Sequence, residues 1–303
     1  MARAVPIDGT DNTRAPAIAR PRGQRITNVL KEQVVPRIIL VLMCGVFILP
    51  FYWMLVVALK SNAELSLSPP TLWPHDPQWG NFADATEVFP FWQFLRNTAT
   101  ITFFTVLGAA ISNPIVAYGF SRIDWPGRDK VFALVLATVF IPFPVLIIAL
   151  FDIFARLGWI NTILPLVVPM FFGSAFWIFL MRQFFMQIPR ELSDAAKLDG
   201  ASELRILFQI ILPQSYAAVS VVCIFAALHA WNDYLGPLLF LQEPSQYTLA
   251  IGLSFFQSQS TYDIQYNLLM AASALVILPV VTLFLFFQRT FVEASRWAAS
   301  SSR

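Results

Sequence analysis

Six long stretches without any charged residue constrain this 303-residue chain more than any other feature. They cover residues 38–59, 97–121, 131–151, 157–181, 206–232 and 264–288. Each is apolar and can supply the roughly 20 residues that cross a hydrocarbon core of about 30 Å. Because lipid offers no partners to backbone N–H and C=O groups, such segments must be helices. The sequence therefore predicts an all-α polytopic membrane protein with six transmembrane helices.

The overall composition supports this class and excludes others. Only 13% of the residues are charged and 57% are hydrophobic, whereas soluble domains carry about 25% charged residues. The formal net charge of +2 gives no electrostatic signature of a nucleic-acid partner. A seventh charge-free window, 244–262, is rich in Ser and Gln, and we predict a loop or an interfacial segment there.

The distribution of basic residues predicts the orientation in the membrane. If the N-terminus is cytoplasmic, 17 of the 20 Lys and Arg residues lie on the cytoplasmic side, and only Lys60, Arg96 and Arg156 lie on the other. This positive-inside bias places both termini in the cytoplasm. We expect a disordered basic tail over 1–36, a transmembrane domain over 37–289 and a second cytoplasmic tail over 290–303. Membrane lipid is the expected surrounding of the domain.

The chain lacks the motifs of the common enzyme classes. It has neither a dinucleotide-binding glycine fingerprint nor a phosphate-binding P-loop. Its two histidines, His75 and His229, are too few for a catalytic metal site. We therefore predict no catalytic residue, no metal and no enzymatic activity. A standalone channel or ion-coupled carrier is the alternative to the transport function developed below, although the only buried ionisable groups available to it are His229 and Asp233.

The segment 182–213, between the fourth and fifth windows, has the clearest local pattern. Pro189 suits the first turn of a helix, Gly200 can take the left-handed conformation that ends one, and Ser202 can cap the next. Apolar residues then recur at i, i+3, i+4 and i+7, at Leu204, Leu207, Phe208 and Ile211. We predict a cytoplasmic hairpin of two helices with a single apolar face on the second.

Three functions can be considered for this hairpin: DNA binding, a structural linker, or docking of a cytoplasmic partner. Four basic residues are matched by four acids, namely Glu191, Asp194, Asp199 and Glu203, so there is no phosphate-binding footprint and we expect no nucleic-acid partner. The small side chains of Ala195 and Ala196 permit close approach, and the surrounding charges can fix the register of a partner. Docking is the favoured interpretation.

The hairpin also resembles a known family signature. Residues 194–213 resemble the EAA motif of permease subunits in binding-protein-dependent ABC importers: an acid, two alanines, three residues, a glycine, nine residues, then Ile-x-Leu-Pro. The matching positions are Asp194, Ala195, Ala196, Gly200, Ile210, Leu212 and Pro213. Segments 81–102, 117–129, 157–169, 179–192 and 231–240 are similar to the shorter permease of maltose-type and glycerol-phosphate-type carbohydrate importers. Asp194 stands where the family usually has Glu.

The resemblance implies a multi-subunit machine in the bacterial cytoplasmic membrane. It implies a second, non-identical permease subunit, two P-loop ATPase subunits and an extracytoplasmic solute-binding protein. The hairpin would be a coupling helix that sits in a groove of the ATPase, with Glu191 and Asp199 added to the seven motif positions. This chain would bind no cofactor, since ATP and Mg²⁺ would belong to the ATPase subunits. The cargo would be a sugar, a polyol or a glycerophospho compound.

Polar residues within the spans are candidates for the transport pathway: Trp231, Asn232, Asp233 and Asn113. An ionised Asp in lipid costs about 2.5 to 3.5 kcal/mol, so we expect Asp233 to face a cavity or a partner. A structural alternative stays open for each polar group. Asn232 and Asp233 can bond to helix ends around Pro237, and Asn113 can satisfy carbonyls freed by the kink at the proline that follows it.

Overall fold

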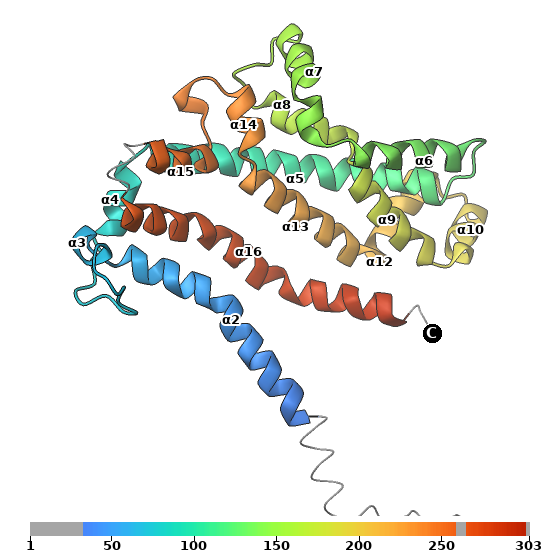
Figure 1. Cartoon of the computed structure of the whole chain (residues 1–303). Coiled ribbons are helices and arrows are strands. Elements are labelled where there is room, and N and C mark those ends of the chain that lie inside the picture. The colour runs from blue at the N-terminus through green and yellow to red at the C-terminus, as the bar shows by residue number, and fades with distance from the viewer. Residues whose placement is uncertain (1–32, 259–264, 301–303) are drawn as a thin grey trace, which may run out of the picture. The chain divides into compact units, whose positions relative to one another are not determined.

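The structure is a computed structural model that describes residues 33–258 and 265–300, without the side chains of 257–258 and 289–300. All regular elements in these ranges are helices (Figure 1). The chain divides into two compact units, Met1–Trp53 and Met54–Arg303. The longer helices are α2 (Val35–Ala58), α5 (Phe91–Ser121), α6 (Arg128–Ala137), α7 (Phe143–Arg156), α9 (Ala175–Gln187), α10 (Arg190–Leu198), α13 (Tyr216–Asn232), α15 (Leu249–Ser258) and α16 (Tyr266–Ser300). The shorter ones are α3 (Asn62–Leu65), α4 (Asn81–Glu87), η2 (Thr138–Phe140), α8 (Leu164–Val167), η3 (Val168–Phe172), α11 (Glu203–Ile206), η4 (Leu207–Ile211), α12 (Leu212–Gln214), α14 (Leu235–Phe240) and η5 (Pro244–Gln246).

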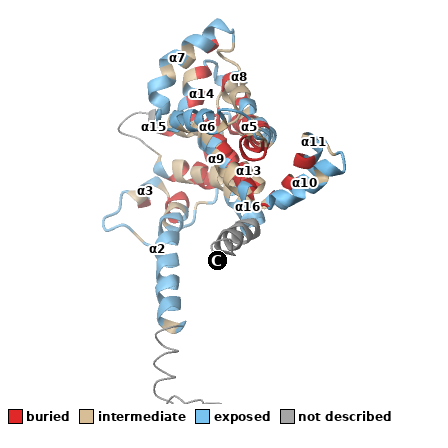
Figure 2. Ribbon diagram, turned by 90° about the vertical axis from the view of Figure 1, so that its right-hand side faces the viewer, coloured by how far each residue is buried: buried red, intermediate tan, exposed pale blue. Residues whose placement is uncertain are grey.

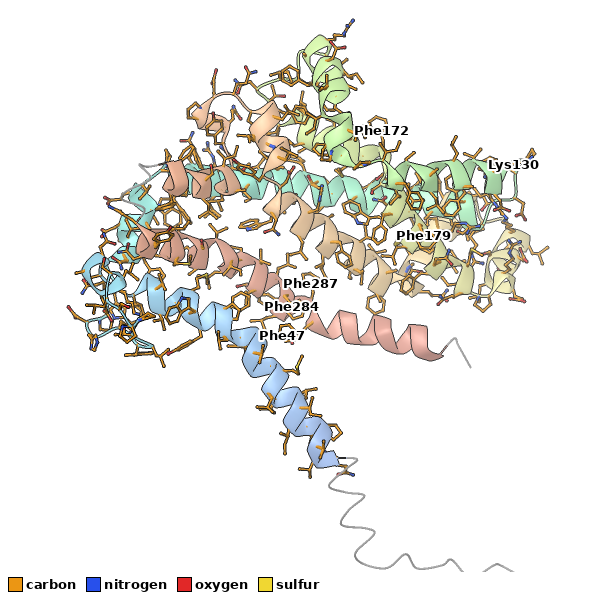
Figure 3. All side chains as sticks on the ribbon, in the orientation of Figure 1. Phe47, Lys130, Phe172, Phe179, Phe284 and Phe287 are labelled. Atoms are coloured by element: carbon orange, nitrogen blue, oxygen red, sulfur yellow. The ribbon has the colours of Figure 1, made fainter. Side chains whose placement is uncertain are left out.

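The described part of the first unit consists mainly of the first turns of α2. Every side chain from residue 35 to 52 is exposed within the chain, although most are aliphatic or aromatic (Figure 2). An apolar surface of this extent is unfavourable in water, whereas it is favourable against the hydrocarbon core of a membrane. The same holds for the exposed Phe172, Phe284 and Phe287 of the second unit (Figure 3). These helices therefore have the surface of a membrane protein.

In the second unit, α5 packs against α13, α9 and η3 and is also contacted by α8 and α15. Small residues make this close packing possible. A Cβ atom on Gly108 would lie 2.8 Å from the Phe171 ring, so only glycine admits η3 at this distance. One half of α5 joins a core around Met181, Phe185 and Ile206, and the other half a core around Phe89, Phe94 and Phe256.

The prediction of an all-helical membrane protein is confirmed, and the structure adds bends that the apolar windows do not show. Val35–Ala58, Phe91–Ser121, Leu164–Gln187 and Tyr266–Gln288 are each long and apolar enough to cross a membrane. Two further candidates are bent pairs: Arg128–Phe140 with Phe143–Arg156 turns by 101°, and Glu203–Gln214 with Tyr216–Asn232 turns by 84°. The described residues thus give four spans, or six if each bent pair crosses, so the count of six stays a prediction.

Local chemistry accounts for both bends. Ile141 is extended because Pro142 follows it, and α7 begins only at Phe143, with Pro144 in its first turn. Ser215 has φ −111° and ψ 17°, outside the α-helical values, and separates α12 from α13. Neither 131–151 nor 206–232 is one continuous helix, since each window contains a break.

Two further segments, within 244–262 and after position 289, are helical where the sequence did not indicate a helix. The segment 244–262 contains the helix α15, whose Leu249, Ile251 and Phe256 are buried, so it is more than a loop as far as residue 258. Because apolar and polar residues alternate in this segment, its sequence does not indicate that α15 packs against α5 and α16. The backbone of α16 continues as a helix across position 289 to Ser300. Most of the expected tail 1–36 lies outside the described residues.

The segment that follows α2 is folded around a buried lysine. Lys60 is 1% exposed, and its Nζ donates to the Thr71 carbonyl at 2.5 Å. Glu64 accepts from the Thr71 hydroxyl at 2.7 Å and from the His75 amide at 3.2 Å. The Thr71 hydroxyl bond, the His75 amide and the nearby charges of His75 and Lys60 hold the pKa of Glu64 below its usual value. The ionised carboxylate therefore stabilises the loop 61–79.

This arrangement predicts an acid-sensitive loop. A carboxylate with a lowered folded-state pKa stabilises fully above its usual pKa of about 4.3, and the stabilisation is lost as the pH falls through the lower folded value. Glu64→Ala should therefore lower hydrogen-exchange protection factors over 61–79 at pH 7. Protection of the same segment in the wild type should fall only below about pH 4.

Glu87→Ala is the matched control, because Glu87 is exposed and lies outside this network. We expect it to leave the protection factors of 61–79 unchanged. Equal effects of the two substitutions would contradict the role given to Glu64.

Candidate functional site

The hairpin consists of α10, a glycine turn and a second helical arm. α10 ends at Leu198, and Gly200 follows with a φ of +78°. A Cβ at this position would meet nothing within 4 Å, so the requirement for glycine comes from the backbone alone. The Ser202 hydroxyl accepts from the Arg205 amide at 3.4 Å and caps α11. The helix–turn–helix form thus arises from local sequence.

The second arm differs from the predicted single apolar face. Residues 207–211 form a π-helical turn, η4, in which a wider turn changes which side chains share a face. Leu207 and Ile211 are buried, whereas Leu204 and Phe208 are exposed. The prediction that these four residues form one face is therefore wrong: one pair packs into the core and the other faces outward.

The candidate coupling residues divide in the same way between surface and core. Glu191, Asp194, Ala195, Asp199, Gly200 and Pro213 are exposed. Ala196, Ile210 and Leu212 are half-buried against the core that contains Met181 and Ile206. Leu198 is 90% exposed, although sequence reasoning did not single it out. The outward side of the hairpin is thus a mixed apolar and acidic surface.

The inner side of the hairpin contacts the end of α5. Tyr118 donates to a Glu203 carboxylate oxygen at 2.5 Å, and the other oxygen pairs with Lys197 at 2.9 Å. Arg122 is 7% exposed and donates through Nη2 to the carbonyls of Phe185 and Ile188, the latter at 2.5 Å. None of Tyr118, Arg122 and Lys197 was predicted as a functional residue.

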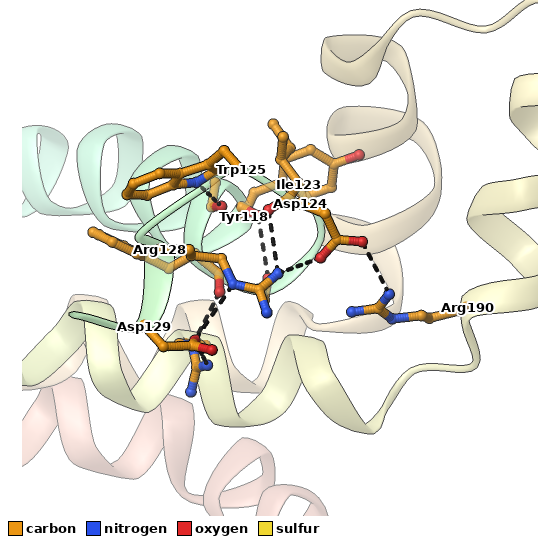
Figure 4. A network of polar contacts seen from close by, with 11 residues as sticks. Tyr118, Ile123, Asp124, Trp125, Arg128, Asp129 and Arg190 are labelled. Carbon is orange, nitrogen blue, oxygen red and sulfur yellow. Dashed lines mark hydrogen bonds and ion pairs between the residues drawn. The ribbon is translucent and has the colours of Figure 1, made fainter. Parts of the chain in front are cut away.

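An exposed ionic network borders this contact (Figure 4). Arg128 pairs with Asp124 at 2.6 Å, and Arg190 at the start of α10 reaches the other Asp124 oxygen at 3.4 Å. The Arg128 bond and the Arg190 charge hold the pKa of Asp124 below its usual value. Exposed pairs of this kind contribute at most about 1 kcal/mol each, so they fix register more than stability.

A cavity of about 290 Å³ lies between α5, α7, α13 and α14. Its lining is mostly apolar, and its polar side chains are Thr105, His229 and Asp233. The Thr105 hydroxyl is buried without a hydrogen-bond partner within the chain, whereas Asp233 accepts from the Gly236 amide at 3.0 Å. The cavity therefore presents the Asp233 carboxylate and the His229 ring on apolar walls, while the Thr105 hydroxyl is enclosed; such a lining suits a polar solute with apolar faces.

The four predicted pathway residues do not converge on this cavity. Asp233 alone lines it. Trp231 lines a separate cavity of about 220 Å³ and donates through Nε1 to the Val276 carbonyl at 3.2 Å. The exposed Asn232 donates to the Leu228 carbonyl of its own helix at 2.8 Å. Thr105 was not predicted, because a lone threonine in an apolar helix carries no sequence signal.

Asn113 is fully buried and joins two helices. Its Nδ2 donates to the Ala109 carbonyl at 2.8 Å, and its Oδ1 accepts from the Ser174 amide at 2.9 Å, directly before α9. This is the geometry of the structural alternative, in which the amide satisfies backbone groups beside Pro114. Among residues 33–258 and 265–288, no three His, Cys, Asp or Glu side chains gather closely enough to hold a metal ion.

The different contacts of Asn113 and Asn232 predict that the same substitution lowers the free energy of unfolding by different amounts. Asn113→Leu orphans the Ser174 amide and should lower the free energy of unfolding in detergent by about 1–3 kcal/mol. Asn232→Leu removes only a bond within one exposed turn and should change it by less than about 0.5 kcal/mol. Denaturant titration of both purified variants measures the difference. Equal losses would show that Asn113 does not join α5 to α9.

Comparisons with known proteins agree with this architecture. The profile of the family described as binding-protein-dependent transport system inner membrane component matches residues 25–296. The chain is 34% identical to the arabinooligosaccharides transport system permease protein AraQ of Halalkalibacterium halodurans over 207 residues, 68% of this chain and 73% of that protein. It is 31% identical to the sn-glycerol-3-phosphate transport system permease protein UgpE of Pectobacterium atrosepticum, over 80% of this chain and 89% of that one.

A solved structure has a similar fold. It is a crystal structure of a bacterial ABC transporter involved in the import of the acidic polysaccharide alginate, and one of its chains matches with a TM-score of 0.74. The sequence identity is 21%, and the match covers 89% of this chain and 98% of that chain. The likeness concerns the arrangement of the helices.

Proposed function

The chain belongs to the family of binding-protein-dependent transport system inner membrane components, and we propose that it forms half of the pathway by which an ABC importer carries a sugar or sugar-like solute. The family match over residues 25–296 carries this proposal. Members of the family are transport components, not catalytic enzymes, and lie in the inner membrane. The relatives named above are permease proteins of an arabinooligosaccharides transport system and of an sn-glycerol-3-phosphate transport system.

The cargo class is supported by the cavity. Asp233 and His229 can bond to solute hydroxyls, while Phe143, Phe154 and Phe240 supply apolar walls for the faces of a sugar ring. Within the described ranges, the residues that line the cavity include no Lys or Arg. A polyhydroxylated solute therefore fits this half of the pathway.

The proposed partners are those that the family resemblance implies. A second, non-identical permease would supply the other half of the pathway, and an extracytoplasmic binding protein would deliver the solute. Two P-loop ATPase subunits would bind ATP and Mg²⁺, and this chain would hold no cofactor of its own. Both termini would be cytoplasmic, because the basic residues concentrate on that side.

The hairpin is the proposed coupling element. When the ATPase subunits close on ATP, they would displace the paired hairpins, and the helices would change from an inward-open to an outward-open pathway. The exposed acids Glu191, Asp194 and Asp199 would fix the register of the docked ATPase. Gly200 would keep α10 and the second arm at a fixed angle.

The experiment is reconstitution of the complete importer in proteoliposomes. A companion permease and a P-loop ATPase should co-purify with this chain, and a solute found by thermal-shift screening of the binding protein should stimulate ATP hydrolysis and uptake. Purification of this chain as an active homo-oligomer without an ATPase would contradict the proposal.

Gly200 tests the coupling step within the same system. Gly200→Val forces a β-branched residue into positive φ, a strain of about 1–3 kcal/mol, so hydrolysis should continue while uptake falls about fivefold or more. Gly200→Asn is the matched control, because asparagine adopts this conformation readily. Gly158→Val places the same strain on another open glycine with a φ of +71° and should leave coupling unchanged. Normal uptake in Gly200→Val would contradict the role of the hairpin.

A further inference from the structure

The end of α5 is fastened to the hairpin at more than one point. Tyr118 and Arg122 lie one turn apart on α5 and its C-cap, so their side chains share a face. Tyr118 reaches the second arm through Glu203, and Arg122 reaches the last turn of α9, immediately before α10. The start of the hairpin and the start of its second arm are thereby tied to one helix.

The Arg122 contact consists of two hydrogen bonds to carbonyls at the end of α9. The Phe185 carbonyl also accepts from the Ile188 amide within the helix end, where the last carbonyls lack the usual intrahelical partners. The guanidinium donates to both carbonyls and places a positive charge at the negative end of the helix dipole. Because Arg122 is 7% exposed, water cannot easily replace these bonds.

The Tyr118 contact extends to both arms. Glu203, the first residue of α11, accepts from Tyr118 through one oxygen and pairs with Lys197 of α10 through the other. The carboxylate therefore joins α5, α10 and α11 at one point. A charge-assisted bond of this kind has a defined direction as well as energy.

The same helix also reaches the cavity. Thr105 lies 13 residues before Tyr118, which is about 20 Å along a helix, and lines the cavity with Ile101. The turn around Pro114 between them is fastened to its neighbours, because the Ser112 hydroxyl bonds to the Met170 carbonyl at 2.8 Å and Asn113 bonds to the Ser174 amide. A mechanical connection from the hairpin to the cavity through α13 is less direct. The chain bends by 84° beside Ser215 and contains the π-helical η4 on this side.

We propose that Arg122 and the Tyr118–Glu203 hydrogen bond join the hairpin and α5 into one mechanical unit. Displacement of the hairpin then reaches the cavity through α5 in addition to α13. This inference rests on the proposed coupling function of the hairpin. Arg122, Tyr118 and Glu203 are positioning residues, since they contact neither the cavity nor the outward side of the hairpin.

The test is the number of ATP molecules hydrolysed per solute imported by the complete complex in proteoliposomes. Arg122→Met should raise this ratio about fivefold or more, while Arg122→Lys, which keeps a cationic donor, should stay within about twofold of wild type. Arg156→Met is the matched control, because Arg156 is exposed and, within the part of the chain that the structure describes, forms its ion pair with Asp152 one turn away.

A double-mutant cycle tests the Tyr118–Glu203 bond. Tyr118→Phe removes one oxygen atom and should leave expression unchanged while raising the ratio about threefold, as should Glu203→Ala. The double variant should resemble the single ones, because either substitution already breaks the link. Tyr266→Phe and Glu243→Ala, at exposed sites outside the contact, should behave as wild type.

Two results would overturn this inference while leaving the proposed function intact. One is an unchanged ratio in Arg122→Met with hydrolysis and uptake falling together, which is the mark of a purely structural role. The other is additive effects of Tyr118→Phe and Glu203→Ala. A wild-type complex whose ATP hydrolysis does not respond to solute would instead refute the proposed function, and this inference with it.

Discussion

The close packing of α5 against η3, α9 and α13 is the interaction on which the rest of the second unit depends. This packing requires small residues. At Gly108, for example, the Cβ atom of any other residue would collide with the Phe171 ring. In lipid there is no hydrophobic driving force between helices, so contacts of this kind and buried hydrogen bonds must hold them together. Asn113 adds such a bond by joining α5 to the start of α9. The cavity and the hairpin both take their positions from this helix.

The scarcity of charge explains where function can lie. Polar groups in the apolar spans are few, and most of them satisfy backbone groups, as Asn113, Asn232 and Trp231 do. Asp233 and His229 are the polar residues that the cavity can offer to a solute, since the Thr105 hydroxyl is enclosed. The charged residues concentrate instead at the hairpin and the end of α5, where a partner in the aqueous phase can contact them. The proposed sites of solute contact and of coupling to a motor are therefore separated along the same helices.

Local signals in the sequence predicted local structure well. The apolar windows predicted helices, Gly200 predicted a positive φ, and Ser202 predicted a cap, because each depends on neighbouring residues alone. The bends at Ile141 and Ser215 are not visible in the hydropathy, which does not report direction.

Contacts between distant residues could not be predicted in this way. Tyr118 and Glu203 are 85 positions apart, and neither segment contains a sequence signal that identifies the other as its partner. The same is true of the cavity, where Thr105 meets Asp233 only after α5 and α13 have packed. The second arm of the hairpin shows the intermediate case: its apolar residues were identified, but the π-helical turn sends Leu204 and Phe208 outward.

The central claim is that the outward side of the hairpin docks onto an ATPase subunit, and site-specific photocross-linking tests it most directly. Cys44 and Cys223 would be replaced by serine, and a benzophenone maleimide attached to Leu198→Cys, where the native side chain is 90% exposed. In the complete complex, this site should yield an adduct with the ATPase, whereas the exposed Trp73→Cys should yield none. An ATPase adduct from position 73, or none from position 198 in a complex that transports solute, would contradict the account.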